Sequence, residues 1–391
     1  MDYPAEARTI SNDSSTGIAA AVGRQSAVDM TRLPKYFPAI DGLRACAVLG
    51  VILFHLHVRG MALGWAGVWL FYVISGFLIT GILLDAKSQP HYFRNFYARR
   101  TLRIFPIYYL LLILLYLAAA HNGTSVRDVG YYAFYMQNQL LGWTQFTPAF
   151  PTAYNHTWTL AVEEQFYLLW PLIVCFLSAN FLPWLCVALI FVAPIARACI
   201  LHFTHNSSIS LTPLICNVDS LGIGALLAIW IRGNRLGMTK AAASLKIKQG
   251  VEVLSLAILI TILSIVLSYG HRAYWNSTDW MPSVNVNIVF TTILSLWFAS
   301  LVFYVAVWDS WLRRILSHRF LVHPGRISYG IYLFHYPVLI YAGSLLRAAY
   351  PHLGNSRIVL VFVTLLMSYI LALTSWHFVE TRFLRLKRQF V

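Results

Sequence analysis

Residues 66–85 read AGVWLFYVISGFLITGILLD, and the only charged residue among them is the final aspartate. A helix needs about 20 mostly apolar residues to cross a bilayer, because the hydrocarbon core is about 30 Å thick and each residue adds about 1.5 Å. The stretch meets this requirement by itself and predicts a membrane-spanning helix.

The rest of the chain has the same character. Of its 391 residues, 59% are hydrophobic and 11% are charged, whereas roughly a quarter of the residues in soluble domains are charged. Ten segments are long and apolar enough to span: 41–58, 66–85, 103–120, 160–179, 182–202, 213–231, 251–269, 286–307, 327–347 and 357–379. We therefore predict an all-α integral membrane protein with about ten transmembrane helices. The aromatic stretch 129–142 is too short to span and is expected to be interfacial or re-entrant.

The positions of the basic residues predict the orientation. If the chain starts in the cytoplasm and alternates, 22 Lys and Arg residues fall in inside segments and 5 in outside segments. Cytoplasmic loops carry such an excess, so both termini are predicted to be cytoplasmic. This bias accounts for the net charge of +15 and argues against nucleic acid as a partner. Residues 1–38 lack the apolar core of a signal peptide and are expected to be a flexible cytosolic tail before one transmembrane domain, 39–391.

The sequence shows no pattern typical of a disulfide framework or a metal site. The five cysteines fall in or beside apolar runs and include no CxxC pair, so neither a disulfide framework nor a metal site is expected. Gly222 and Gly224 lie within a predicted span, where small residues favour close helix packing.

Among the ionisable residues of the first predicted span are Arg44 and His55. His55 follows Arg44 by eleven positions, which is three turns plus about 20° and about 16 Å of helix, so they share one face. Ionisable residues inside a membrane are costly and suggest function. A snorkelling arginine with a helix-contact histidine explains the pair equally well.

Two further groups could act with this pair. Arg100 and Arg103 face the same way on a helix and suit either a membrane anchor or a clamp for phosphates. Glu163 and Glu164 lie just inside the outer boundary of the fourth span, and adjacent residues diverge by about 100°. One of them is therefore expected to face the bundle, where a pair with His55 becomes possible.

These motifs occur in a specific order. They are Asp41-Gly42-Leu43-Arg44 with His55, Gly67 to Leu78, Arg100 with Arg103, Trp158 to Pro171, Ser328 to His335, and Val379-Glu380. Together they resemble the acyltransferase 3 family of membrane O-acyltransferases, from about Tyr36 to Arg388. The resemblance implies transfer of an acyl group, usually acetyl from acetyl-CoA, to a hydroxyl of a carbohydrate such as surface or exported polysaccharide. It also implies a multi-pass protein of the bacterial inner membrane.

The resemblance assigns roles to individual residues. It implies that His55 is the catalytic base, that Arg44, Arg100 and Arg103 bind the donor, and that Glu163 holds the family's acidic position, with Glu164 a weaker candidate. Four residues are expected to line the cavity: Ser75, Ser328, Tyr332 and His335. Helix-packing hydrogen bonds explain the last three equally well. Acyl-CoA is expected as a co-substrate, with no permanently bound cofactor and no metal.

Our hypothesis for the mechanism is that His55, oriented by Glu163, deprotonates the acceptor hydroxyl; a covalent acyl-histidine intermediate stays open. Asn217 stands where the resemblance leads us to expect an arginine two residues before Asp219, which weakens a role for that aspartate. No esterase-like domain follows the tenth span, so a stand-alone form is expected. The alternatives are a secondary transporter with a His/Glu proton relay, a scaffold that binds lipid or polymer, and acylation of an antibiotic or lipid.

Overall fold

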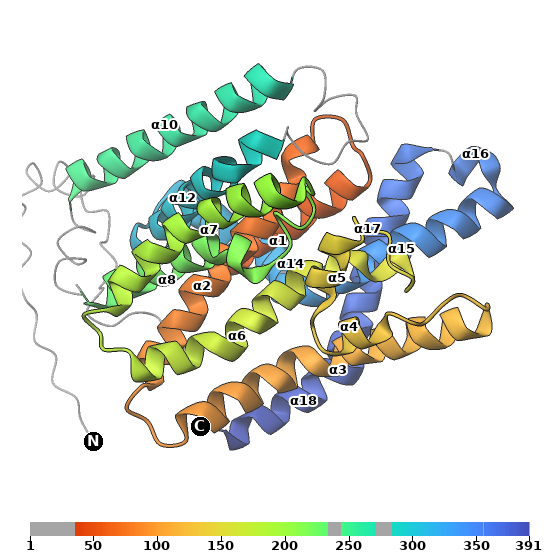
Figure 1. Cartoon of the computed structure of the whole chain (residues 1–391), viewed down its shortest axis with the longest axis horizontal. Coiled ribbons are helices and arrows are strands. Elements are labelled where there is room, and N and C mark those ends of the chain that lie inside the picture. The colour runs from red at the N-terminus through yellow and green to blue at the C-terminus, as the bar shows by residue number, and fades with distance from the viewer. Residues whose placement is uncertain (1–35, 234–243, 271–283, 355, 391) are drawn as a thin grey trace, which may run out of the picture.

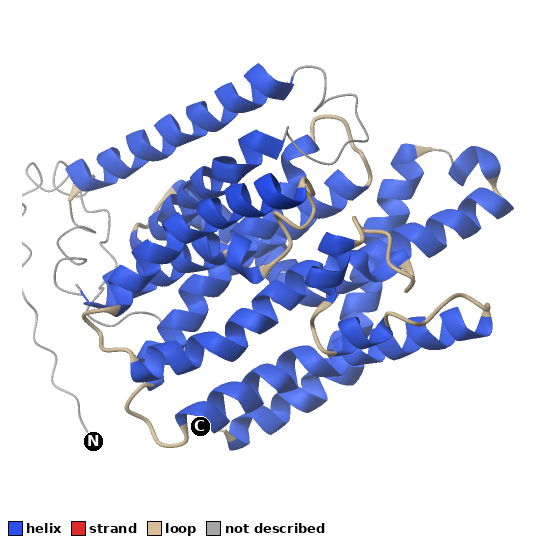
Figure 2. Ribbon diagram, in the orientation of Figure 1, coloured by secondary structure: helices blue, strands red, loops and turns tan. Residues whose placement is uncertain are grey.

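The computed structural model describes residues 36–233, 244–270, 284–354 and 356–390. Within these ranges every regular element is a helix and no strand occurs (Figure 2). The all-α fold class is therefore confirmed. The cytosolic tail predicted for residues 1–38 lies almost wholly outside the described residues, since the first described helix begins at Pro38.

Each of the ten predicted spans is a helix. In chain order they are α1 (Pro38–His55), α2 (Gly67–Ala86), α3 (Tyr92–His121), α6 (Trp158–Phe176), α7 (Leu182–Thr204), α8 (Val218–Gly233), α10 (Leu245–Gly270), α12 (Val284–Val307), α15 (Ser328–Ala349) and α17 (Arg357–Ser375). Among the described helices, eight are long and apolar enough to cross a membrane, and α8 and α15 are not among them. The protein is thus a multi-pass membrane protein, while the count of ten spans and the side of each terminus stay predictions.

Short helices lead into the long ones. The 3₁₀ turns η1 (Ala62–Ala66) and η2 (Thr152–Thr157) run directly into α2 and α6. The aromatic stretch expected to be interfacial or re-entrant forms α4 (Val129–Ala133) and α5 (Gln137–Trp143). Gln137 is fully buried, and its amide donates to the Thr157 carbonyl at 2.9 Å. This bond ties α5 to the bundle at the start of α6.

α2 lies inside the bundle and packs against α1, α6, α8 and α12 (Figure 1). It crosses α8 at two glycines. A Cβ atom on Gly76 would lie 2.0 Å from the carbonyl oxygen of Leu221, and one on Gly224 would lie 2.1 Å from that of Val73. The close packing predicted for Gly224 is confirmed, because only glycine allows the two backbones to approach this closely.

In contrast, α10 lies at the edge of the bundle, beside α12 (Figure 1). Many of its large apolar side chains point outward, and those of Val253, Leu254 and Leu256 are more than half exposed. In a water-soluble protein such a surface would aggregate, so this face suits lipid.

The end of the chain returns to α3. α17 continues through a π-helical turn, η4 (Trp376–Glu380), into α18 (Thr381–Leu386) and η5 (Lys387–Gln389). α18 runs beside the first half of α3 (Figure 1). Two short helices, α13 (Trp311–Leu316) and α14 (Arg319–Arg326), pack against α1.

Candidate active site

One face of α6 carries polar residues at intervals of one turn: Thr159, Glu163 and Tyr167. Ser75 of α2 donates its hydroxyl hydrogen to Glu163 Oε1 at 2.8 Å, and Tyr167 donates to Glu163 Oε2 at 3.0 Å. Thr159 Oγ1 lies 2.7 Å from the hydroxyl oxygen of Tyr332 on α15. We call these five side chains the polar column.

The predicted donor-binding arginines gather at one end of the polar column. The guanidinium of Arg100 lies 4.8 Å from the centre of the Tyr167 ring, a favourable cation–π distance. Arg44 and Arg100 are within electrostatic range of Glu163, and Arg103 is within range of both other arginines. We call Arg44, Arg100 and Arg103 the arginine cluster. The structure thus brings α1 and α3 together where the sequence predicted a donor site.

Asp41 offsets only part of the positive charge near this cluster. Its carboxylate lies 3.6 Å from Arg44 Nη1 and 3.9 Å from Arg326 Nε. Tyr36 also donates to it at 2.7 Å. One carboxylate is therefore shared between two guanidiniums.

The C-terminal segment brings another cation to the arginine cluster. Lys387 of η5 follows the last apolar span. Burial, and then the positive charges of Arg103, Arg99 and Arg100, lower the pKa of Lys387 to about 8. An anion bound here would gain from each of these charges.

Three histidines meet at the other end of the polar column. His55 ends α1, His156 lies in η2 and His335 lies on α15. His55 Nδ1 is 3.0 Å from His335 Nε2, and their rings are stacked with centroids 5.2 Å apart. The His156 ring meets the His335 ring edge-on, with centroids 4.9 Å apart. We call these residues the histidine cluster.

Tyr332 joins the polar column to the histidine cluster. Besides its contact with Thr159, its hydroxyl donates to the His156 carbonyl at 3.0 Å. Its own carbonyl oxygen lies 2.5 Å from His335 Nδ1. Polar groups therefore follow one another from the arginine cluster to the histidine cluster.

The structure gives His55 a different partner from the hypothesised Glu163. The imidazole of His55 contacts His335, while the carboxylate of Glu163 is held by Ser75 and Tyr167. The two side chains lie at different depths in the helix bundle. His55 is the last residue of α1, whereas Glu163 lies five residues into α6, about 7.5 Å from its start.

The remaining predicted residues have separate places. Glu164 makes no hydrogen bond with another described residue and lies within electrostatic range of Arg100, so Glu163 is the glutamate that faces the polar column. Ser328 is fully buried, and its hydroxyl has no hydrogen-bond partner in the described parts of the chain. It lies one turn before Tyr332 on the same face of α15.

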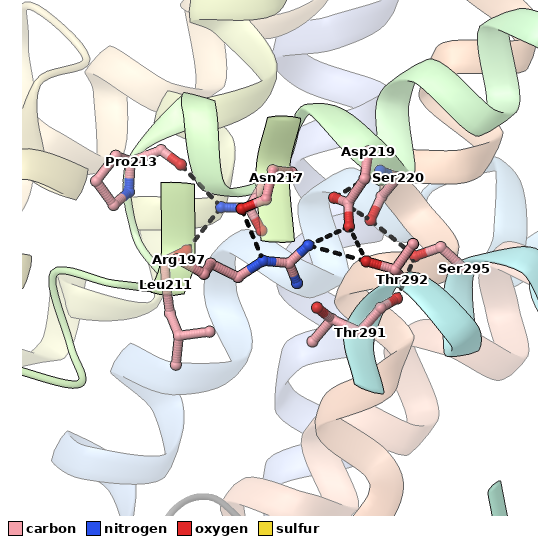
Figure 3. Close-up of polar contacts among 10 residues, drawn as sticks. Arg197, Leu211, Pro213, Asn217, Asp219, Ser220, Thr291, Thr292 and Ser295 are labelled. Carbon is pink, nitrogen blue, oxygen red and sulfur yellow. Dashed lines mark hydrogen bonds and ion pairs between the residues drawn. The ribbon is translucent and has the colours of Figure 1, made fainter. Parts of the chain in front are cut away.

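A second polar network lies between α7, α8 and α12 (Figure 3). Arg197 of α7 contacts the carboxylate of Asp219 on α8, and both side chains are buried. Thr292 of α12 donates to Asp219 Oδ2 at 2.6 Å. Beside them, the hydroxyl oxygens of Ser220 and Ser295 are 2.7 Å apart (Figure 3).

Asp219 has a guanidinium partner although the arginine expected two residues before it is absent. Asn217, which occupies the position where an arginine was expected, donates to the carbonyls of Leu211 and Pro213 at 2.6 and 3.0 Å (Figure 3). Arg197 supplies the guanidinium from the neighbouring helix instead. Sequence spacing alone does not reveal this partner, because it depends on which helices are adjacent.

Sequence reasoning also missed His156. It is 5% exposed, and neither ring nitrogen has a hydrogen-bond partner among the described residues. The signal was its spacing, since His156 precedes Thr159 by three residues and Glu163 by seven, which places it on the same helical face.

Comparison with known proteins gives the family. The model of the acyltransferase 3 family, described as an acyltransferase domain, matches residues 37–377. The chain belongs to this family. The polar column, the arginine cluster and the histidine cluster all lie within the matched residues, whereas Lys387 lies beyond them.

Three curated relatives from bacteria are similar along most of the chain. O-acetyltransferase OatA of Staphylococcus aureus is 27% identical over 366 residues, which cover 89% of this chain and 57% of OatA. The putative peptidoglycan O-acetyltransferase YrhL of Bacillus subtilis is 30% identical over 372 residues, 90% of this chain and 55% of YrhL. Peptidoglycan O-acetyltransferase OatA of Listeria monocytogenes is 27% identical over 366 residues, 89% of this chain and 56% of the relative. The chain thus spans little more than half the length of these relatives. No solved structure matches it significantly.

Proposed function

We propose that this protein transfers an acetyl group from acetyl-CoA to a hydroxyl of a cell-envelope carbohydrate. The observation that carries the proposal is the succession of polar side chains between the arginine cluster and the histidine cluster. The similarity to proteins named as peptidoglycan O-acetyltransferases supports a carbohydrate acceptor.

The arginine cluster suits the donor. Coenzyme A carries a diphosphate and a further phosphate, and guanidinium groups bind phosphates through paired, charge-assisted hydrogen bonds. The excess of basic residues in the predicted inside loops favours a cytosolic position for this end of the bundle, where acetyl-CoA is available.

The distance between the clusters suits the pantetheine arm. Arg44 and His55 are separated by about 16 Å along α1. Phosphates held at Arg44, Arg100 and Arg103 would leave the arm to follow the polar column. The thioester would then lie near His55.

At His55 the reaction is a base-assisted acyl transfer. The imidazole takes the proton of the acceptor hydroxyl, and the oxygen attacks the thioester carbonyl. The carbon–sulfur bond then breaks, and the departing thiolate takes the proton that His55 holds. The products are an acetyl ester and free CoA, with His55 neutral again. A positioned base of this kind contributes typically about 10²–10⁴-fold to a rate.

The test uses the full-length protein in nanodiscs with [¹⁴C]acetyl-CoA and a peptidoglycan glycan fragment. The wild-type protein is expected to label the fragment and release CoA, and His55→Ala is expected to abolish both. His121→Ala is the matched control, because His121 is an exposed histidine at the end of α3. Transfer by His55→Ala at the wild-type rate would refute the mechanism. Proton flux without label transfer would instead favour a transporter.

A further inference from the structure

The contacts of His335 determine which of its nitrogens carries the proton. Its Nδ1 lies 2.5 Å from the carbonyl oxygen of Tyr332. A carbonyl oxygen only accepts hydrogen bonds, so Nδ1 must be the donor. In the neutral ring, Nε2 of His335 then holds a lone pair and can only accept.

The same logic extends to His55. Its Nδ1 lies 3.0 Å from His335 Nε2. Because His335 Nε2 accepts, His55 Nδ1 must donate and therefore carries the proton. The Nε2 of neutral His55 is then left with a lone pair, which is the form that a general base requires.

We infer that His335 is a positioning residue that holds His55 in the tautomer with a basic Nε2, and that the Tyr332 carbonyl fixes His335 in turn. The inference rests on the proposed function, in which His55 is the base. It gives His335 the place that the sequence hypothesis gave to Glu163. Two neutral imidazoles and a carbonyl thus take the part that a histidine and a carboxylate play in a serine hydrolase.

The surroundings fix this arrangement. His335 is fully buried, so water does not compete for its nitrogens. The turn of α15 that supplies the carbonyl is anchored from both sides, because the Tyr332 hydroxyl contacts Thr159 at 2.7 Å and the His156 carbonyl at 3.0 Å.

A neutral partner also suits a site within a membrane. A buried carboxylate costs several kcal/mol unless it is paired, whereas a neutral imidazole with both nitrogens engaged does not carry that cost. When His55 takes a proton on Nε2, its Nδ1–H continues to donate to His335, so the pair stays intact through the reaction.

Two substitutions distinguish the role of His335 from simple packing. His335→Phe keeps the ring and removes the acceptor, whereas His335→Gln offers an amide oxygen near the position of Nε2. We expect His335→Phe to lower kcat about 100-fold, at the lower end of what a base contributes, with KM for acetyl-CoA unchanged. His335→Gln should recover kcat to within about tenfold of wild type.

A spectroscopic signature provides a readout that does not depend on activity. With ¹⁵N-labelled histidine, the His55 signals should report the Nδ1–H tautomer in the wild-type protein and in His335→Gln, and a shift toward Nε2–H in His335→Phe. Wild-type kcat in His335→Phe, or an unchanged His55 tautomer in that variant, would overturn the inference. If His55→Ala instead retains transfer, the proposed function fails, and the tautomer measurement still tests the contact by itself.

Discussion

Arg197 of α7 and Asp219 of α8 form an ion pair whose side chains are 1% and 0% exposed. A charge in such surroundings costs several kcal/mol unless it is paired. Each of the two residues therefore depends on the other, and together with Thr292 they fasten α7, α8 and α12 at one point.

Removing one partner should destabilise the protein strongly. Asp219→Ala leaves a buried guanidinium without its counter-ion, and we expect the free energy of unfolding to fall by about 3–5 kcal/mol. Unfolding of the purified protein in detergent measures this. The double variant Arg197→Met/Asp219→Leu removes both charges and is expected to be close to wild type or more stable. Wild-type stability of Asp219→Ala would contradict this account.

The arginine cluster should control donor affinity. Arg103→Ala removes a charge-assisted contact worth about 1.5–3 kcal/mol, so KM for acetyl-CoA is expected to rise at least about tenfold with a smaller change in kcat. Arg103→Lys should recover only part of the loss, because an ammonium cannot form the paired contact. Arg314→Ala serves as the control, since Arg314 is an exposed arginine whose guanidinium is paired with Asp309. Equal KM values for Arg103→Ala and Arg314→Ala would remove the arginine cluster from the donor site.

The two adjacent glutamates should behave differently. Glu163 accepts hydrogen bonds from Ser75 and Tyr167, whereas Glu164 lacks such contacts among the described residues. Glu163→Ala is therefore expected to lower kcat/KM about tenfold or more, because Ser75 and Tyr167 lose the carboxylate that accepts a hydrogen bond from each of them, and Glu164→Ala is expected to lower it less. Steady-state kinetics on both variants compares them directly. A larger loss in Glu164→Ala would assign the acidic role to Glu164.

Lys387 should make donor binding sensitive to pH. Phosphate favours the charged ammonium, and the pKa of Lys387 in the free protein is lowered to about 8. The charged fraction falls as the pH rises through 8, so acetyl-CoA affinity is expected to weaken between pH 7.5 and 9, with proton uptake on binding. Calorimetry on His55→Ala avoids turnover during the measurement.

The matched variants of Lys387 have opposite expectations. Lys387→Gln should bind acetyl-CoA weakly both at pH 7.5 and at pH 9, and it should lose the proton uptake on binding. Lys387→Arg should bind acetyl-CoA tightly at both pH values, because a guanidinium stays charged. A wild-type pH dependence in Lys387→Gln would assign the effect to another group.

The helices were predictable from the sequence because lipid leaves few choices. A chain in a bilayer must satisfy its backbone hydrogen bonds internally, so long apolar runs such as 66–85 become helices. The arginine cluster was also foreseeable, since Arg100 and Arg103 share a face and follow a predicted cytosolic loop. These predictions depend on spacing within one helix or on the side of the membrane.

Contacts between helices were not predictable in the same way. The partner of His55 is His335, 280 residues later, and that of Asp219 is Arg197 on a neighbouring helix. Each pairing depends on how the helices are arranged and at what depth each side chain lies. Hydropathy and periodicity report neither quantity.

The crossing of α2 and α8 at Gly76 and Gly224 limits how the protein could be re-engineered. Ser75 of the polar column immediately precedes Gly76, and Asp219 lies two residues before Leu221, the backbone contact of Gly76. Enlarging a side chain at either glycine would separate the two helices and displace both polar networks together. Under the proposed function, substitutions meant to change the choice of acceptor belong in η2 and near His335 on α15, and the two crossing glycines are best left unchanged.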